Sequence, residues 1–362
     1  MVTASIERPA TAEELARRLR DAAEAKLAVV PVGGGRAAGM GGSLERRDVE
    51  LHTTRLDRVL EHSHPDMVVS VEAGITLEAL QQELGKAGQF LPLDPFNSPG
   101  HTIGGLIATG WTGPLRLRYG SARDFLIGVR VALPDGKLVS AGGRVVKNVS
   151  GYDMMKLHHG ALGSLGVVVA ASFKVFPRPL RDVTLEATFT PMEEAWAEAE
   201  RALSLPLAPA ALELFSSGRV LARLQGSPEA VERMAGELSW KSVDDAAWTE
   251  HAKQAPTSWA RIAVPRHSLR ALLDCLPAGA EWWASAGAGI AHWSFGADAE
   301  KLRAVREKVE TAGGSLVVMA GPPEVIDAAG AWGTPPSTLD LMRRLKDEFD
   351  PGRTLNPGRF LV

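Results

Sequence analysis

Apolar residues recur every three or four positions in several stretches of the chain, a spacing that places them on one face of a helix. Leu15, Leu19 and Ala22 follow this pattern directly after Thr11-Ala12-Glu13-Glu14, a capping box with a hydroxyl at the N-cap and a carboxylate three residues later. Glycines and a serine–proline pair mark other helix ends. The sequence predicts helices over residues 12–25, 77–87, 228–238, 297–312 and 338–349.

Short apolar or β-branched runs between these helices predict buried strands. One hairpin joins residues 125–133 to 138–141, because Pro134-Asp135-Gly136-Lys137 combines the fixed φ of proline with the positive φ open to glycine. Further strands are predicted at residues 27–31, 48–52, 67–71, 167–176, 220–225 and 290–295. Residues 92–113 are rich in Gly, Pro and other small residues and are predicted to be a long loop, which inside a compact domain is usually functional.

The chain of 362 residues is long enough for about two domains. Pro177-Arg178-Pro179 is the first boundary, and after it strand-like and helix-like pieces alternate as in an α+β domain, with two similar halves as one possibility. Residues 328–337 are small and Pro-rich, as in a linker. We therefore expect three segments, at residues 1–179, 180–330 and 331–362.

Composition removes several function classes. The chain is 45% hydrophobic and 23% charged, which excludes disorder, and its net charge of −3 offers no basic field for nucleic acid or an anionic membrane. The single cysteine, Cys275, excludes an intrachain disulfide, a Cys-ligated iron–sulfur cluster and a Cys-rich zinc site. The charged N-terminus lacks the apolar core of a signal peptide, so we expect a cytoplasmic protein without direct membrane insertion. Attachment to the inner face of the membrane through a partner stays open.

Glycine segments carry the candidate chemistry. The predicted strand at 27–31 runs into Gly33-Gly34-Gly35, followed by Arg36 and Ala37. Consecutive glycines let backbone N–H groups converge on an anion, and such a nest holds phosphate oxygens. A tight turn without a ligand is the alternative, at the entropic cost of three adjacent glycines.

Two later segments have the same character. Residues 99–110 are small at nearly every position, and Thr102 and Thr109 can donate hydroxyl hydrogen bonds to phosphate or ribose. Residues 160–166 carry glycine every third position before a β-branched strand. Packing under a helix is an equally good explanation for residues 99–110, and a helix C-cap explains one glycine of residues 160–166. Three such segments in one proposed domain favour a shared ligand.

A dinucleotide-binding Rossmann site is the rival interpretation. It requires G-x-G-x-x-G opening a helix, whereas Ala38 stands at the third glycine position and residues 39–42 would disrupt any helix. The chain also lacks a Walker A lysine. The sequence therefore predicts phosphate binding by a loop.

In their order along the chain, these segments resemble the vanillyl-alcohol oxidase, or PCMH-type, superfamily of FAD-binding proteins. The resemblance rests on residues 31–35, 102–109, 151–167 and 349–358, the last reading Phe-Asp-Pro-Gly with Leu-Asn-Pro-Gly, and spans about residues 10–180 and 335–362. Residues 113–120 and 143–153 are similar in particular to the FAD-binding E subunit of bacterial glycolate oxidase.

The resemblance implies a PCMH-type FAD-binding domain of two α+β subdomains, built from both chain ends, with a ferredoxin-like α+β cap over the flavin ring. It implies non-covalent FAD, since the first loop has no histidine. Segment 33–37 would face the pyrophosphate, segment 100–109 would line the next stretch, segment 163–168 would contact the adenosine or flavin region, and Asn356 would lie near the ring. The implied cofactor-binding residues are Val32, Gly33, Gly34, Gly35, Arg36, Ala37, Gly100, Thr102, Ile103, Gly104, Gly105, Thr109, Gly110, Gly163, Ser164, Gly166, Val168 and Asn356.

The implied function is hydride transfer from a small 2-hydroxy acid of the glycolate or D-lactate type to FAD. A larger FAD-binding catalytic subunit and an iron–sulfur subunit would be the partners. Catalytic members carry a His-rich, metal-linked stretch on a cap strand, of which only His292 remains here, so we expect no metal site and assign no catalytic residue. A catalytically silent, FAD-containing scaffold is the alternative. Arg116 and Arg118 are candidates for binding a substrate carboxylate or for surface ion pairs.

Overall fold

The computed structural model describes residues 4–143, 153–253 and 256–362. It begins with a small parallel sheet in the order β1-β3-β2, covered on one side by α1 (Ala12–Glu24). Its strands are β1 (Ser5–Glu7), β2 (Val29–Val32) and β3 (Val49–His52). The predicted N-cap is confirmed, because the Thr11 hydroxyl accepts from the Glu14 N–H at 3.1 Å, and Leu15 and Leu19 are fully buried against the sheet.

A five-stranded antiparallel sheet in the order β4-β5-β9-β7-β8 follows. Its strands are β4 (Val59–Ser63), β5 (Val68–Glu72), β7 (Leu126–Ala132), β8 (Leu138–Gly142) and β9 (Val167–Lys174). The helices are α2 (Leu77–Gly85), α3 (Ile103–Thr109), α4 (Arg116–Tyr119), α5 (Ala122–Phe125) and α6 (Met155–His158), and β6 (Gln89–Phe90) pairs with β10 (Phe176–Pro177). The predicted hairpin is confirmed, with Gly136 at φ +82° in its turn.

The predicted loop over residues 92–113 is wrong in one part, because it contains α3. The Thr102 hydroxyl accepts from the Gly105 N–H at 3.3 Å, and Gly110 ends the helix at φ +63°. Two glycines make its intrinsic helix propensity poor. The almost complete burial of Ile103, Leu106 and Ile107 supplies the stability that the local sequence lacks.

The middle of the chain forms an eight-stranded antiparallel sheet, hereafter the cap sheet, in the order β14-β11-β13-β12-β16-β17-β15-β18. The first half comprises β11 (Arg181–Thr188), α7 (Met192–Leu203), β12 (Ala211–Phe215), β13 (Arg219–Gly226), α8 (Pro228–Leu238) and β14 (Lys241–Val243). The second comprises β15 (Trp259–Ala263), α10 (Leu269–Asp274), β16 (Trp282–Ser285), β17 (Ile290–Ser294), α11 (Ala299–Thr311) and β18 (Ser315–Ala320). Each half has the β-α-β-β-α-β order with its fourth strand beside its first, the arrangement of the ferredoxin-like motif.

The halves meet where β12 pairs with β16, and α9 (Ala246–Lys253) lies between them in sequence, with the short 3-10 turns η1 (Arg266–Ser268) and η2 (Ala286–Ala288) completing the second half. One predicted boundary is wrong: α11 begins at Ala299 and not at residue 297, because the Asp298 carboxylate caps it through the Glu300 and Lys301 N–H groups, both at 3.0 Å.

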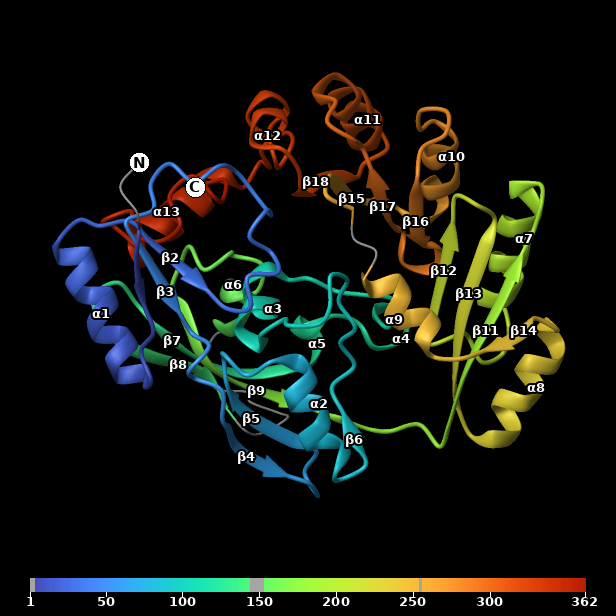
Figure 1. The fold of residues 1–362 in the computed structure, drawn as a ribbon, viewed down its shortest axis with the longest axis horizontal. Coiled ribbons are helices and arrows are strands. Elements are labelled where there is room, and N and C mark those ends of the chain that lie inside the picture. Colours follow the sequence, from blue (N-terminus) through green and yellow to red (C-terminus); the bar gives the residue numbers. More distant parts are fainter. Residues whose placement is uncertain (1–3, 144–152, 254–255) are drawn as a thin grey trace.

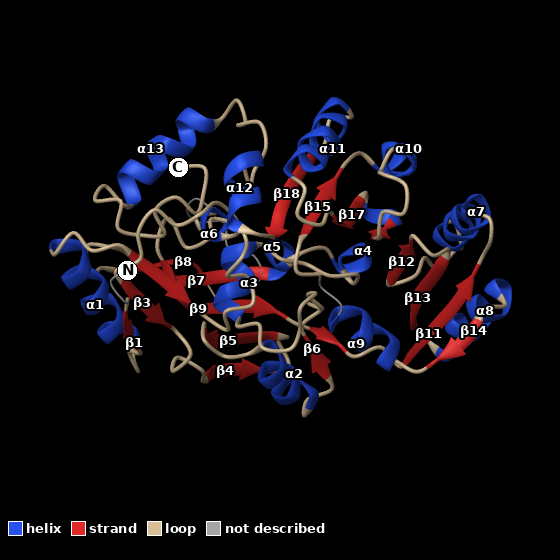
Figure 2. Ribbon diagram, turned by 45° about the horizontal axis from the view of Figure 1, so that its top comes forward, coloured by secondary structure: helices blue, strands red, loops and turns tan. Residues whose placement is uncertain are grey.

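The two faces of the cap sheet have different partners. Residues such as Leu214 and Trp293 pack under α7, α8, α10 and α11, which Figure 2 shows along its outer side. The alternate residues, among them Trp259 and Trp283, pack instead into the core of the N-terminal part. The cap sheet thus covers the end of the N-terminal part to which residues 96–111 belong.

The C-terminal segment returns to the N-terminal sheet after α12 (Pro323–Ala329) and α13 (Leu339–Phe349), and Figure 1 shows α13 at the same end of the molecule as α1. Leu355 forms a parallel bridge with Val29, flanked by hydrogen bonds from the Val29 N–H to the Thr354 carbonyl at 2.8 Å and from the Asn356 N–H to the Val29 carbonyl at 3.0 Å. No helix within the described ranges is long and apolar enough to span a membrane.

Candidate cofactor-binding site

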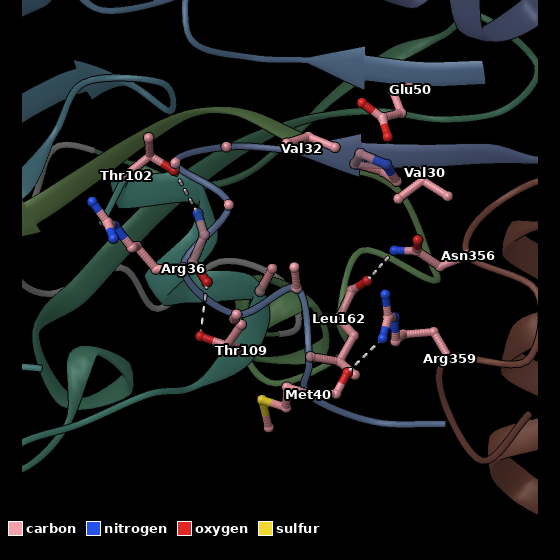
Figure 3. Close-up of a pocket in the computed structure, with 18 of the residues that line it drawn as sticks. Val30, Val32, Arg36, Met40, Glu50, Thr102, Thr109, Leu162, Asn356 and Arg359 are labelled. Atoms are coloured by element: carbon pink, nitrogen blue, oxygen red, sulfur yellow. Dashed lines mark hydrogen bonds between the residues drawn. The ribbon is translucent and has the colours of Figure 1, made fainter. Parts of the chain in front are cut away.

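A cavity of about 230 Å³ lies where the loop after β2, helix α3, Leu162 and the C-terminal segment converge (Figure 3). Segments more than 300 residues apart in sequence therefore line one space. Its lining is Val30, Pro31, Val32, Gly33, Gly34, Gly35, Arg36, Ala37, Ala38, Met40, Leu44, Arg47, Glu50, His101, Thr102, Gly105, Ala108, Thr109, Leu162, Asn356 and Arg359.

The triple glycine makes the floor of this cavity by backbone contact alone. A Cβ on Gly34 would lie 1.7 Å from the Gly100 carbonyl oxygen, and one on Gly33 would lie 2.1 Å from Thr102 Oγ1. Gly35 has open space around it but adopts φ +72°, which disfavours other residues. Glycine is therefore needed at 33 and 34 for close approach and at 35 for conformation.

The threonine hydroxyls of α3 have intrachain partners. Thr109 Oγ1 donates to the Gly105 carbonyl at 2.8 Å, and Thr102 Oγ1 accepts from the Gly105 N–H (Figure 3). The Thr109 hydroxyl therefore donates its hydrogen bond within the helix. The Thr102 hydroxyl accepts a hydrogen bond there, so its hydrogen is available for donation to a ligand.

Positive charge surrounds the cavity. Arg36, Arg47 and Arg359 line it together with one carboxylate, Glu50. The Arg47 guanidinium lies 3.1 Å from Glu50, and Arg359 Nη1 donates to the Met40 carbonyl at 3.2 Å, whereas the structure gives Arg36 no ion pair with any described residue. Burial lowers the pKa of Arg359, as does Arg47. The net excess of cations suits a diphosphate.

A second cavity of about 60 Å³ adjoins the first, with which it shares Pro31, Val32, Gly33, Gly105, Ala108 and Leu162. The third glycine segment lines it through Gly163 and Gly166, and a Cβ on Gly166 would lie 2.5 Å from Val131 Cγ1. His158 also lines it, and burial lowers the pKa of this imidazole to about 4, so the ring is neutral at pH 7.

The C-terminal return closes the site. Asn356 Nδ2 donates to the Leu162 carbonyl at 2.6 Å, while its buried Oδ1 has no hydrogen-bond partner among the residues that the structure describes. Lys346 Nζ donates to the Ser164 carbonyl at 2.8 Å, to the Leu355 carbonyl at 3.0 Å and to the Asp350 carboxylate at 2.6 Å. One buried ammonium therefore fixes the third glycine segment and the return segment together.

Most of the predicted cofactor-binding residues meet at these two cavities. Those lining at least one are Val32, Gly33, Gly34, Gly35, Arg36, Ala37, Thr102, Gly104, Gly105, Thr109, Gly163, Gly166, Val168 and Asn356. Gly100, Ile103, Gly110 and Ser164 line neither.

Each of these four has a different setting. Gly100 lies beneath the Arg36 side chain, whose Nε would be 2.8 Å from a Cβ there, and Gly110 ends α3 beside His159. Ile103 is fully buried in the core. Ser164 Oγ donates to the Ala161 carbonyl at 2.7 Å, so its hydroxyl is engaged within its own turn. Residues 144–152, part of the resembling segment at 143–153, lie outside the described residues.

Sequence reasoning missed Met40, Arg47, Glu50, His101, Leu162 and Arg359, which also line the first cavity. The alternation of β3 gives a signal for Glu50, whose neighbours Val49 and Leu51 are buried on the opposite side. Arg359 follows the Asn-Pro-Gly turn directly, where a basic residue next to a return segment is a candidate ligand. The sequence gives no signal for Lys346, because a lysine at this helix position is expected to be exposed.

Aromatic rings fill the contact between the cap sheet and the N-terminal part. Trp259 has ring-centroid distances of 5.6 Å to Trp111, 5.9 Å to Trp283 and 5.3 Å to His292, and Phe96 lies 4.9 Å from His292. Burial lowers the pKa of His292 well below its ordinary value, and Arg261 and His251 lower it further, so this ring is neutral. Among residues 4–143, 153–253 and 256–362, no group of three or more His, Cys, Asp or Glu could hold a metal ion.

Known proteins share the sequence and the fold. The FAD binding domain family matches residues 3–142. Glycolate oxidase subunit GlcE of Escherichia coli (strain K12) is 30% identical over 307 residues, which cover 83% of this chain and 84% of that protein. A D-lactate dehydrogenase of Anaerostipes hadrus is 31% identical over 214 residues, 58% of this chain and 44% of that one.

Glycolate oxidase subunit GlcD of Bacillus subtilis (strain 168) is 29% identical over 213 residues, covering 59% of this chain and 45% of the longer relative. The solved structure of an alkyldihydroxyacetonephosphate synthase has the same fold, with a TM-score of 0.72 over 97% of this chain and 76% of that one at 18% identity.

Together with the fold and the cleft, these matches define a FAD-binding oxidoreductase, and the predicted PCMH-type resemblance is confirmed. More narrowly, the chain belongs to the family of the glycolate oxidase subunit GlcE. The residues fit the cofactor on structural grounds as well: a glycine floor with no room for a side chain at Gly33 and Gly34, three surrounding arginines, and the Asn356 Oδ1, which has no hydrogen-bond partner among the described residues.

Proposed function

We propose that this chain is the FAD-binding subunit of a complex that oxidises a small 2-hydroxy acid of the glycolate or D-lactate type. The observation that carries the proposal is the convergence of segments 33–37, 102–109 and 162–168 with Asn356 around two adjoining cavities. The names of its relatives, glycolate oxidase subunits and D-lactate dehydrogenases, support the substrate class. Residues 1–179 and 331–362 would form the FAD domain and residues 180–330 the cap.

Different residues would bind different parts of the cofactor. The backbone of Gly33, Gly34 and Gly35, with Arg36, would hold the diphosphate, and no His stands in this loop to bond covalently to the flavin. Thr102 and Asn356 would supply a hydroxyl and an amide to the rest of the molecule. FAD, when bound, accepts a hydride from the carbinol carbon of the substrate. The protein's part is to hold, orient and shield the cofactor.

Electrons must then leave through another protein. The single cysteine cannot provide the thiolates of an iron–sulfur cluster, so an iron–sulfur subunit would receive them, alongside a larger FAD-binding subunit. GlcE of Escherichia coli and GlcD of Bacillus subtilis are both named as subunits of a glycolate oxidase, which supports such a complex. We place the complex in the cytoplasm, with any contact to the inner face of the membrane made by a partner.

The decisive experiment is to purify the chain alone and with its partners. The chain should copurify with FAD that is released by denaturation without proteolysis, and glycolate or D-lactate should reduce a dye acceptor. A colourless chain that takes up no FAD refutes the proposal. Flavin that stays attached to the denatured polypeptide refutes the non-covalent mode.

A second candidate, a FAD-containing scaffold without turnover of its own, has a specific observation in its favour. The rings of Phe96, Trp111, Trp259 and Trp283 pack tightly where the cap meets the N-terminal part, and His292 is neutral and caged among them. Dye reduction only after partner subunits are added identifies the scaffold, whereas dye reduction by the isolated chain identifies the catalyst.

A further inference from the structure

A further cavity, of about 410 Å³, lies between α6, the third glycine segment and α13, apart from the two cofactor cavities. Its volume falls within the range of about 300–1,000 Å³ that is usual for small-molecule sites. Arg123 and Lys156 line it together with apolar side chains that include Met342, Leu345 and Phe360. We call this space the α13 cavity.

The apolar wall of the α13 cavity is an uncovered face of its helix. Met342 and Leu345 lie three residues apart and therefore share one side of α13. Both are half-buried, and neither packs against a hydrophobic core in the part of the chain that the structure describes. An amphipathic helix normally buries its apolar face. The wall thus offers apolar area that a ligand can cover.

The other side of the cavity carries positive charge. The exposed Arg123 guanidinium has no ion pair or hydrogen bond with any described residue. Lys156 Nζ donates to two backbone carbonyls, which leaves one of its three protons free, and its carboxylate partner, the exposed Asp153, lies 3.9 Å away. Asp124 is engaged in capping α5. The buried Nε2 of His159, at the same cavity, also has no partner among residues 4–143, 153–253 and 256–362. These groups suit one anion.

One turn of the chain separates the α13 cavity from the second cofactor cavity. Ala161 lines both. On either side of it the neighbours divide: His158 and Gly163 line the cofactor cavity, whereas His159 and Ser164 line the α13 cavity. The two spaces are therefore neighbours across the third glycine segment, and a ligand in the α13 cavity leaves the cofactor cavities free.

We propose that the α13 cavity binds a medium-chain monocarboxylate, with the carboxylate at Arg123 and Lys156 and the unbranched chain along Met342 and Leu345. An anion without a chain would leave the apolar wall uncovered, and a neutral chain would leave the two cations without a counter-ion. An amphiphilic anion satisfies both sides. This site goes beyond the proposed function, because a small 2-hydroxy acid has no apolar part to cover the wall.

The test is isothermal titration calorimetry of the FAD-loaded chain with decanoate below its micellar concentration. Decanoate should bind at one site per chain, and the affinity should fall by up to about fourfold for each methylene that is removed in octanoate and hexanoate. Acetate keeps the charge without the chain, and decanol keeps the chain without the charge, so both should bind more weakly than decanoate. The flavin absorbance of the same samples should show that FAD stays bound.

Arg123→Met tests the charged side. It should weaken decanoate binding by about threefold to fivefold, as expected for an exposed ion pair, and leave decanol binding unchanged. Arg343→Met is the matched control, because Arg343 lies on α13, pairs with Asp340 at the surface and does not line the cavity. It should bind decanoate as the unaltered chain does.

Met342→Gln tests the apolar wall. It keeps the length of the side chain but places an amide against the ligand, so the gain in affinity per methylene should shrink. Leu341→Gln is its control, since the neighbouring Leu341 is 48% exposed and does not line the cavity. The thermal midpoint of each variant shows that the chain is folded.

Three results overturn the inference. The first is a chain that does not bind decanoate. The second is decanoate binding that Arg123→Met and Met342→Gln leave intact, or that decanol equals. The third is release of FAD by decanoate, which would place the acid in the cofactor cavities.

Discussion

Lys346 Nζ lies 2.6 Å from Asp350 Oδ2, and both side chains are almost completely buried. The Asp350 carboxylate also accepts from the Thr354 N–H at 2.9 Å and the Leu355 N–H at 2.8 Å, while Lys346 reaches the Ser164 carbonyl. The pair thus holds the turn that carries Asn356 against the third glycine segment. A buried ion pair in which both carboxylate oxygens and the ammonium are hydrogen-bonded is specific in geometry, and removing one partner leaves an unpaired buried charge.

Replacing Lys346 with Met should therefore destabilise the chain by about 3–5 kcal/mol, the usual cost of an uncompensated buried charge, and release FAD. The measurement is urea unfolding together with the FAD content of the purified protein. Lys301→Met is the control, since Lys301 pairs with Asp298 at the surface and should cost less than about 1 kcal/mol. Equal effects of the two substitutions would contradict the role given to Lys346.

The glycine floor makes a second prediction. Gly34→Ala should reduce FAD affinity by more than about tenfold, because its Cβ would collide with the Gly100 carbonyl and overpacking of this kind costs about 1–3 kcal/mol. Gly88→Ala is the matched control: it has room, its φ of +65° costs about 1–2 kcal/mol of stability, and Gly88 lines neither cavity. Titration of FAD into both variants separates the cases, and similar affinities would show that the floor does not contact the cofactor.

The features that the sequence predicts are those whose determinants lie within a few residues of one another along the chain. Gly33–Gly35 and the Asn-Pro-Gly turn are recognisable from the local sequence alone, since a run of glycines or a proline beside a glycine marks a turn or loop. Thr11 and Ser227 mark their helices for the same reason: the capping hydroxyl acts within three residues.

What the sequence could not show depends on distant partners. The order of the cap strands is set by pairings between residues far apart, such as Leu214 with Ala284, which no local pattern records. Lys346 resembles a surface lysine until the return segment covers it, and α3 forms from a poor helix sequence because its apolar side is buried. The strand order of the cap, the burial of Lys346 and the formation of α3 all depend on tertiary packing.

Asn356 tests the return segment directly. It adopts φ +47°, which Asn and Gly tolerate, so Asn356→Gly removes the side chain without straining the backbone. Loss of the hydrogen bond to the Leu162 carbonyl and of the orphaned Oδ1 should weaken FAD binding by about tenfold, corresponding to roughly 1–1.5 kcal/mol.

Lys26→Gly is the control for this change, because Lys26 has a similar φ of +55° at the exposed end of α1. It should bind FAD as the unaltered chain does. If Asn356→Gly also retains full affinity in an equilibrium titration, the amide serves only to hold the turn.

Asp94 makes the chain's stability depend on pH. Burial raises the pKa of its carboxyl to about 8, and Glu213 acts in the same direction, while the Leu115 N–H and Arg223 oppose them. In the unfolded chain this group ionises near pH 4, so between pH 4 and 8 the folded chain holds a proton that the unfolded chain releases. The stability due to the protonated acid is complete below pH 4 and is lost as the pH rises to 8, by no more than about 1.4 kcal/mol per pH unit.

Asp94→Asn keeps an acceptor for the Leu115 N–H and removes the titration, so its stability relative to the unaltered chain should rise from pH 5 to pH 8 in urea unfolding. Asp135→Asn, at the exposed hairpin turn where Lys137 lowers the carboxyl pKa, should show a flat difference over the same range. A flat difference for Asp94→Asn as well would mean that Asp94 is ionised in the folded chain.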